Sequence, residues 1–279
     1  MKLADSHLHL FSDGYRGLYG RSLLRPDVEV YEQLRAIHGI ERGLVVGYQG
    51  EGIDTDNNIY VRSLAAKRSW MATVAHIDAR TIPSAQAVSS LLADGHVGVA
   101  LYVEESRSAK TTASWPAAVW HVLNERRAII SLNVSLDFIS VFASIVRENP
   151  DCVFLVSHMG MPGSYKTAPA PSKVTERLAA LLRLATMHNI LVKISGLYAF
   201  SDPTYDYPHH AAAPFVQAIL ERFGPERCLW GSDFSPALDH VSFAQTVSNP
   251  WLDGLGESER ANVMGKNLIA LLEQVRRQA

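Results

Sequence analysis

Short apolar runs recur along the chain, and most of them are separated by segments with the residue spacing of amphipathic helices. Runs such as Phe154-Leu155-Val156 contain no polar alternation, which is typical of strands buried on both faces. Strands are predicted at residues 2–10, 42–46, 70–77, 97–103, 128–134, 152–157, 190–195 and 227–231. Helices are predicted at residues 26–38, 56–68, 84–93, 115–126, 136–148, 174–188 and 214–223, and again from residue 240 onward.

This regular alternation of strands and helices predicts a parallel sheet. Eight such units in 279 residues fit a (β/α)8 TIM barrel, an α/β fold that would occupy residues 1–279 as a single domain. The main alternative is a doubly wound open sheet, which would carry a glycine-rich phosphate turn after its first strand. That position holds His7-Leu8-His9, and no Gly-x-Gly-x-x-Gly motif follows it. The barrel is therefore the predicted fold.

Composition narrows the classes of partner. The formal net charge is -2, and no dense run of Lys and Arg indicates a nucleic-acid or membrane-surface partner. No apolar run is long enough to span a bilayer, and the first strand begins too early to leave room for a signal peptide. Cys152 and Cys228 cannot form a disulfide framework and are expected to be buried in a cytoplasmic protein. The expected partner is a small-molecule substrate, and the oligomeric state, including a homo-oligomer, stays open.

Polar residues follow the predicted strands at the ends where a barrel carries its catalytic residues. His7 and His9 leave the same face of an extended strand, so both imidazoles can approach one divalent cation or one polarised carbonyl. A pair of buried histidines bonded to the backbone is the alternative interpretation. Later strand ends carry ionisable or hydrogen-bonding residues too, namely Gln49, His76, Asp78, Tyr102, Glu104, Asn133, His158, Lys193, Ser195 and Asp233.

Several of these residues lie in motifs that resemble a known family. Asp5-Ser6-His7-Leu8-His9 resembles the opening of the amidohydrolase superfamily. Ser157-His158-Met159-Gly160, Lys193-Ile194-Ser195-Gly196 and Leu229-Trp230-Gly231-Ser232-Asp233 resemble its lactonase-like branch, as does the closing segment 262–268. That branch includes pyrone-dicarboxylate and muconolactone hydrolases, sugar lactonases and an aldarolactone isomerase. The motifs occur in the expected order across nearly the whole chain.

The resemblance implies that His7, His9, His158 and Asp233 form the catalytic centre, with Asp233 as the general base. Three imidazoles and one carboxylate are a suitable ligand set for a single Zn²⁺ or Mn²⁺ with an open position. In a metal-free version, the histidines would hold the carbonyl oxygen themselves. Relatives with two metals carry a bridging Lys or Glu where this chain has 131–133, Ser-Leu-Asn, so one metal or none is expected.

Side chains at the same end of the barrel are candidates for substrate binding. Guanidinium groups pair well with carboxylates, and tyrosine, amide and imidazole groups can bind hydroxyls or carboxylates. The candidates are Arg16, Arg21, Arg25, Tyr48, Gln49, Tyr102, Asn133, Lys193, Tyr198 and His209.

The predicted reaction is attack of water on the ester carbonyl of a small carboxylated or sugar-acid lactone. Two alternatives use the same site: isomerisation of a lactone, and non-oxidative decarboxylation. Decarboxylase relatives carry a further histidine where Asn133 stands here, which disfavours the second. A ligand-binding barrel without catalysis is the third alternative, disfavoured because His7, His9, His158 and Asp233 are all present.

Overall fold

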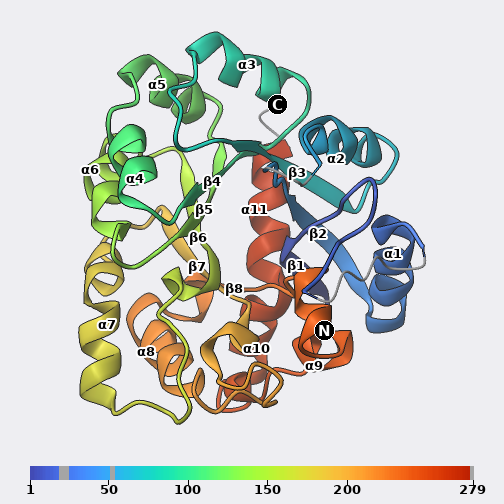
Figure 1. The fold of residues 1–279 in the computed structure, drawn as a ribbon, viewed down its shortest axis with the longest axis vertical. Coiled ribbons are helices and arrows are strands. Elements are labelled where there is room, and N and C mark those ends of the chain that lie inside the picture. The colour runs from blue at the N-terminus through green and yellow to red at the C-terminus, as the bar shows by residue number, and fades with distance from the viewer. Residues whose placement is uncertain (19–24, 51–53, 277–279) are drawn as a thin grey trace.

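The predicted strands form one barrel-like sheet. Within the residues that the computed structural model describes (1–18, 25–50 and 54–276), all eight strands form and pair in parallel in sequence order (Figure 1). They are β1 (Leu3–Leu8), β2 (Ile40–Val46), β3 (Met71–Ile77), β4 (Gly98–Val103), β5 (Ile129–Val134), β6 (Val153–Val156), β7 (Ile190–Ile194) and β8 (Cys228–Trp230). A parallel bridge between Leu8 and Phe234 brings the last strand's continuation against β1. The predicted single-domain (β/α)8 barrel is confirmed.

Helices follow the strands and surround the barrel, except that α11 lies across the N-terminal ends of the strands (Figure 1). They are α1 (Asp27–His38), α2 (Asn57–Ala65), α3 (Ala85–Ala93), α4 (Ser106–Ala113), α5 (Ala117–Glu125), α6 (Phe142–Glu148), α7 (Pro171–Leu184), α8 (Ala213–Phe223), α9 (Phe243–Val247), α10 (Glu257–Ala261) and α11 (Asn267–Arg276). Across the described part of the chain, none of them is long and apolar enough to cross a membrane.

Two local predictions need correction. Helix α4 was not predicted, because its buried face consists of Ser108, Ala109 and Thr112 and therefore gives no apolar periodicity. The helix predicted at residues 56–68 is the shorter α2, and the side chain of Asp56, which precedes it, makes no capping hydrogen bond. The next residue, Asn57, instead accepts a bond from the Tyr48 amide, so α2 is joined to the loop after β2.

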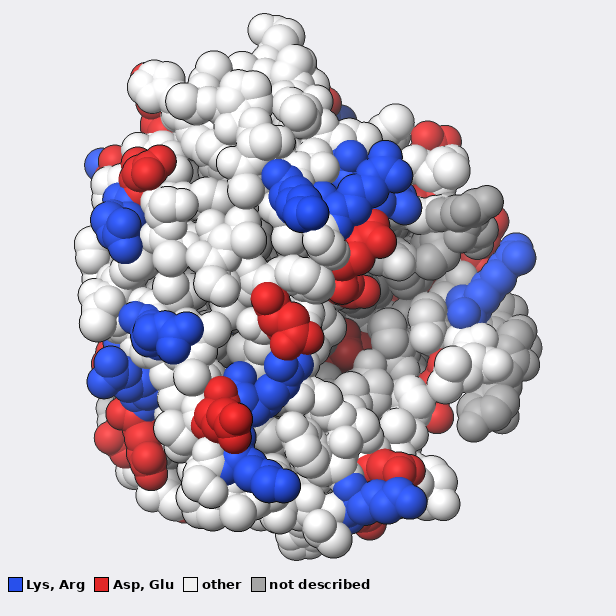
Figure 2. Space-filling view, turned by 60° about the vertical axis from the view of Figure 1, so that its left-hand side comes forward, with Lys and Arg blue, Asp and Glu red and all other residues white. Residues whose placement is uncertain are grey.

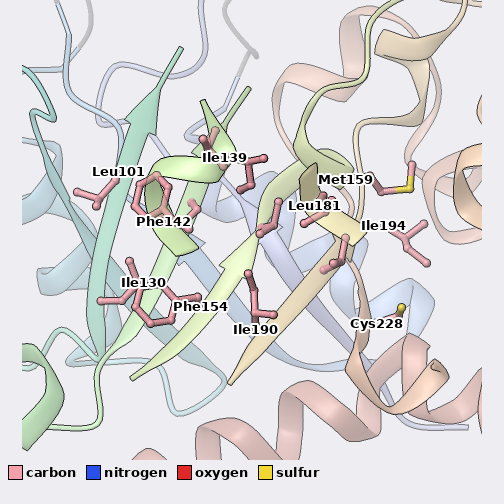
Figure 3. Close-up of a cluster of buried hydrophobic side chains, with 14 of the residues drawn as sticks. Leu101, Ile130, Ile139, Phe142, Phe154, Met159, Leu181, Ile190, Ile194 and Cys228 are labelled. Atoms are coloured by element: carbon pink, nitrogen blue, oxygen red, sulfur yellow. The ribbon is translucent and has the colours of Figure 1, made fainter. Parts of the chain in front are cut away.

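Apolar residues form two layers, because successive strand residues point to opposite faces of the sheet. The outer layer packs strands against helices, and Figure 3 shows part of it, with Ile130 and Ile190 near Phe142 and Leu181. Inside the barrel, a second cluster joins residues of the strands to the apolar face of α11, which includes Leu272. Helix α11 packs towards the strands' N-terminal ends, so the opposite end is free to hold polar side chains.

Strand β1 changes its alternation half-way along. Leu3 belongs to the outer layer and Ala4 to the inner cluster, yet Leu8 belongs to the outer layer again. The pairing of β1 with β2 shifts register between Asp5 and Leu8, which accounts for the change. As a result the odd-numbered His7 and His9 face the barrel interior.

The first and last strands are joined through a buried carboxylate. Asp5 is fully buried and accepts hydrogen bonds from the Ser232 amide (2.9 Å), the Tyr31 hydroxyl (2.9 Å) and the His7 amide (3.1 Å), as well as from the Ser232 hydroxyl. Backbone bonds from Asp233 to His7 and from His9 to Phe234 continue the same junction. This side chain therefore ties β1 to the segment after β8 and to α1.

Replacing Asp5 by Ala should destabilise the fold by about 2–4 kcal/mol, because buried donors then lose their acceptor. Chemical denaturation followed by circular dichroism measures the free energy of unfolding. Asp56→Ala, which removes a carboxylate that makes no capping bond, is the control and should change stability by less than about 0.5 kcal/mol. Equal stability of the two variants would show that Asp5 does not close the barrel.

Candidate active site

Three imidazoles and one carboxylate meet at the open end of the barrel. His7 and His9 come from β1 and the residue after it, His158 follows β6, and Asp233 follows β8. The Nε2 atoms of the three histidines lie 3.6, 3.9 and 4.0 Å from Oδ1 of Asp233, in that order. These distances are too long for direct hydrogen bonds and leave space for another atom between the groups. The structure thus brings together the four residues that the sequence singled out.

The Nδ1 atoms of the histidines point away from Asp233 and are held by other groups. His9 Nδ1 lies 2.9 Å from the carbonyl oxygen of Val46, which can only accept, so His9 carries its proton there and keeps a lone pair on Nε2. His158 Nδ1 lies 3.0 Å from the hydroxyl of Ser195. Each ring is therefore oriented with Nε2 towards Asp233.

His7 has two partners at Nδ1. The Ser157 hydroxyl lies at 3.3 Å and the Lys193 amine at 3.2 Å. A protonated Lys193 donates to Nδ1 and places the imidazole proton on Nε2, whereas a neutral amine permits the opposite tautomer. Nε2 of His7 is buried and has no hydrogen-bond partner among the described residues, so it is directed at whatever occupies the centre.

Lys193 lies beneath the histidines and is fully buried. Its amine donates a 2.7 Å bond to the Ser131 hydroxyl, and desolvation lowers the pKa of Lys193 to about 7. Burial likewise lowers the pKa of His7, His9 and His158, so all three imidazoles are neutral at pH 7. Neutral imidazoles can ligate a metal ion or take part in hydrogen bonds without adding charge.

Asp233 occupies a constrained position. Its φ is 57°, in the left-handed region that non-glycine residues rarely adopt, and its amide donates a 2.8 Å bond to the carbonyl of His7. The Tyr198 hydroxyl donates to Oδ2 at 2.7 Å, which leaves Oδ1 directed at the histidines. Burial raises the pKa of Asp233 to about 6, although the carboxyl stays mainly ionised at pH 7.

The donor set is compatible with one divalent ion. Ligand atoms of His7, His158 and Asp233 all lie within 4.8 Å of one another, and His9 stands outside this group. Two imidazole nitrogens and a carboxylate oxygen are ordinary zinc ligands. The orphaned Nε2 of His7 fits this role in the tautomer whose Nδ1 proton is donated to Ser157.

A cavity of about 220 Å³ opens above these groups. Tyr48, Tyr102 and Asn133 line it together with Glu104, which was noted at a strand end but not proposed as a site residue. The adjoining cavity shares Asn133, His158, Tyr198 and Asp233 with it. Figure 2 shows one face of the molecule, which is hollowed, with acidic side chains in the hollow and both acidic and basic side chains around its rim.

Other candidates for substrate binding lie elsewhere. Arg16 lines a separate cavity with Asp13 and Asp54, and Arg25 is exposed. Gln49 donates to the carbonyl of Thr55. The remaining candidates are His209, which is buried beside a further cavity, and Arg21, which lies outside the described residues.

Several residues at the centre were not expected to have a role there. Ser157 and Ser195 orient imidazoles, and Glu104 reaches the pocket from the end of β4. A serine that orients another side chain cannot be recognised from a single sequence, although both serines lie inside the motifs that contain His158 and Lys193. Glu104 was among the polar residues at the strand ends, but only the folded structure shows that it lines the same pocket as Asp233.

Comparison with known proteins identifies relatives over nearly the whole length. A family model described as amidohydrolase matches residues 4–273. A D-galactarolactone isomerase from Agrobacterium fabrum (strain C58 / ATCC 33970) is 25% identical over 256 residues, which cover 88% of this chain and 79% of that protein.

Solved structures share the fold. An amidohydrolase from Burkholderia multivorans, determined with bound HEPES and again with bound zinc, gives TM-scores of 0.79 and 0.78 at 18% identity, over 97% of this chain and 98% of that one. A protein assigned as a 2-pyrone-4,6-dicarboxylic acid hydrolase from Pseudomonas putida gives 0.74 at 22% identity, over 97% of both chains. At these identities the likeness shows the fold.

The position of His158 depends on Gly196, which gives a direct test. A Cβ at residue 196 would lie 2.5 Å from Nδ1 of His158, and the glycine has a φ of 63°. Gly196→Ala should therefore displace the imidazole and destabilise the protein by about 1–3 kcal/mol. Thermal unfolding and the imidazole NMR signals report the two effects. Gly254→Ala, where a Cβ meets nothing within 4 Å, is the control, and equal behaviour of both variants would contradict the prediction.

Proposed function

The chain belongs to the amidohydrolase family, as its motifs indicated, and on that premise we propose that it opens the ring of a small lactone by hydrolysis. The observation that carries the proposal is the convergence of three imidazole Nε2 atoms on Oδ1 of Asp233. The names of two relatives support a lactone as the substrate, since one is a galactarolactone isomerase and the other is assigned as a hydrolase of a pyrone dicarboxylic acid.

In this proposal His7 polarises the lactone carbonyl. With Lys193 protonated, His7 presents an N–H at Nε2 to the carbonyl oxygen, where negative charge develops during attack. His9 keeps a lone pair at Nε2 and accepts a hydrogen bond from the attacking water or from a substrate hydroxyl. The groups bonded to Nδ1 fix the orientation of the imidazole rings, so little reorganisation accompanies the reaction.

Asp233 acts as the general base. Its free Oδ1 takes a proton from water as the oxygen attacks the carbonyl carbon, and it returns that proton to the ring oxygen when the ring C–O bond breaks. One water molecule is consumed, and the product is a hydroxy acid that releases a proton at neutral pH. Burial brings the pKa of Asp233 to about 6, so the carboxylate is a stronger base than a solvated aspartate but still ionised at pH 7.

In a metal-bound form of the site, His7, His158 and Asp233 would hold a divalent ion, and His7 would then carry its proton on Nδ1 instead of Nε2. Such an ion supplies Lewis-acid polarisation of the carbonyl and lowers the pKa of a bound water. Lys193, Ser157 and Ser195 act as positioning residues in either case, because they set the orientation and the proton of the imidazoles.

A second candidate is isomerisation, favoured by the match to the galactarolactone isomerase. A hydroxyl of the substrate would then replace water as the nucleophile, while Asp233 would move the proton in the same way. This reaction forms a new ring and releases no acid. Proton release therefore separates the two candidates.

A panel of lactones monitored with a pH indicator, with and without chelator, tests the proposal. The enzyme should release acid from at least one lactone, and Asp233→Asn should lower kcat by about 10³-fold through loss of the base. Asp78→Asn changes a carboxylate at the end of β3 that pairs with Arg80, and should alter the rate by less than about threefold. No turnover of any lactone, or an active Asp233→Asn variant, would contradict the proposed function.

The dependence on pH follows from Asp233. Because the base must be ionised, kcat/KM should fall about tenfold per pH unit as the pH drops below about 6. The hydrogen bond from Tyr198 lowers this pKa, so Tyr198→Phe should move the acidic limb to higher pH. A pH–rate profile from 4.5 to 8.5, measured at constant ionic strength, checks both. Tyr205→Phe, at an exposed tyrosine of the neighbouring loop, should leave the limb unchanged.

A further inference from the structure

The β4–β5 side of the pocket has a distinct chemistry. Tyr102 of β4 and Asn133 of β5 are partners in the strand register, so their side chains leave the sheet on the same face. Glu104 lies two residues after Tyr102 and follows it on that face. Both Glu104 and Asn133 line the cavity that contains Asp233 and His158. The wall therefore faces the proposed reaction centre.

Glu104 and Asn133 together present acceptors. The Asn133 amide nitrogen donates to Oε1 of Glu104 at 3.2 Å, which orients its carbonyl oxygen away from the carboxylate. That oxygen, Oδ1 of Asn133, is buried and has no partner in the part of the chain that the structure describes. An ionised carboxylate also only accepts hydrogen bonds. A ligand group that meets this wall must therefore donate.

The charge of the pocket also favours a ligand group that donates hydrogen bonds. Its described lining contains two carboxylates, Glu104 and Asp233, and no lysine or arginine. Lys193 lies below the histidines, with its amine bonded to Ser131 and His7. A carboxylate substituent placed against Glu104 would meet a like charge without a described cation to offset it. A hydroxyl satisfies both acceptors and introduces no charge.

We propose that Glu104 and Asn133 determine specificity by accepting hydrogen bonds from a substrate hydroxyl, so that the enzyme prefers a polyhydroxylated lactone to one with a carboxylate at this position. The inference deepens the proposed function and rests on it. It assigns the β4–β5 wall to substrate choice, while the groups from β1, β6 and β8 perform the reaction.

Matched substrates test the assignment. Kinetics with a sugar lactone, its monodeoxy analogues and an unsaturated dicarboxylated lactone are compared for the wild type, Glu104→Ala and Asn133→Ala. Each variant should lower kcat/KM for the sugar lactone by about tenfold or more, mainly through KM. For the deoxy analogue that lacks the recognised hydroxyl, the same variants should change kcat/KM by less than about twofold.

A charge-reversal variant of Glu104 provides a second test. Glu104→Lys should raise kcat/KM for the dicarboxylated lactone by about tenfold or more, because it places a cation at the wall. Glu125→Lys makes the same change of charge at an exposed residue at the end of α5 and should have no such effect. Thermal unfolding confirms that each variant is folded.

Three results would overturn the inference: equal losses for the sugar lactone and all deoxy analogues, wild-type preference for the dicarboxylated lactone, or no gain with Glu104→Lys. The first would show that the two side chains only shape the pocket. Failure of the proposed function looks different, because no lactone would then be turned over or Asp233→Asn would remain active. In that case this inference falls with it.

Discussion

Asp5 joins the two ends of the strand ladder, and the geometry of the centre follows from that junction. Its carboxylate is bonded to both the amide and the hydroxyl of Ser232, one residue before Asp233. The same carboxylate holds the amide of His7. Two segments separated by more than 200 residues are thus fixed in one register, and Oδ1 of Asp233 lies 3.6 Å from Nε2 of His7. Backbone bonds from Asp233 to His7 and from His9 to Phe234 hold the same two segments together.

The burial of ionisable groups and the backbone strain at this centre cost stability. Burial raises the pKa of Asp5 and Asp233 to about 6 and lowers that of Lys193 to about 7, so the protein disfavours the charged form of each. Left-handed backbone at His158, Met159 and Asp233 adds strain of about 1–3 kcal/mol each. The two apolar layers of the barrel and α11 must offset these terms. Strained backbone and buried ionisable groups therefore occur together around the proposed reaction centre.

Much of the fold could be predicted because each strand of a barrel is recognised from the apolar residues of a single short segment. Apolar runs such as Phe154-Leu155-Val156 gave the strands, and the His7-Leu8-His9 spacing placed both imidazoles on one face, although β1 changes register just before it. Hydrogen bonds between side chains from distant strands could not be predicted. Ser157 and Ser195 meet their imidazoles only after distant strands come together, and nothing local indicates that Asn133 donates to Glu104. Helix α4 was not predicted for a different reason: its buried face consists of two polar residues and an alanine.

The barrel divides into two halves with different freedom to change. In the half that contains β1, β6, β7 and β8, buried side chains bond to one another, so a substitution there affects both the fold and the arrangement of the imidazoles around Asp233. The wall from β4 and β5 ends in Glu104, which is exposed, and its bond to Asn133 is the contact that it makes at this edge. Mutations at such positions are seldom removed for loss of stability. A substitution in the β4–β5 wall would therefore alter the hydrogen-bonding groups of the pocket and leave the buried bonds of Asp5 and Lys193 in place.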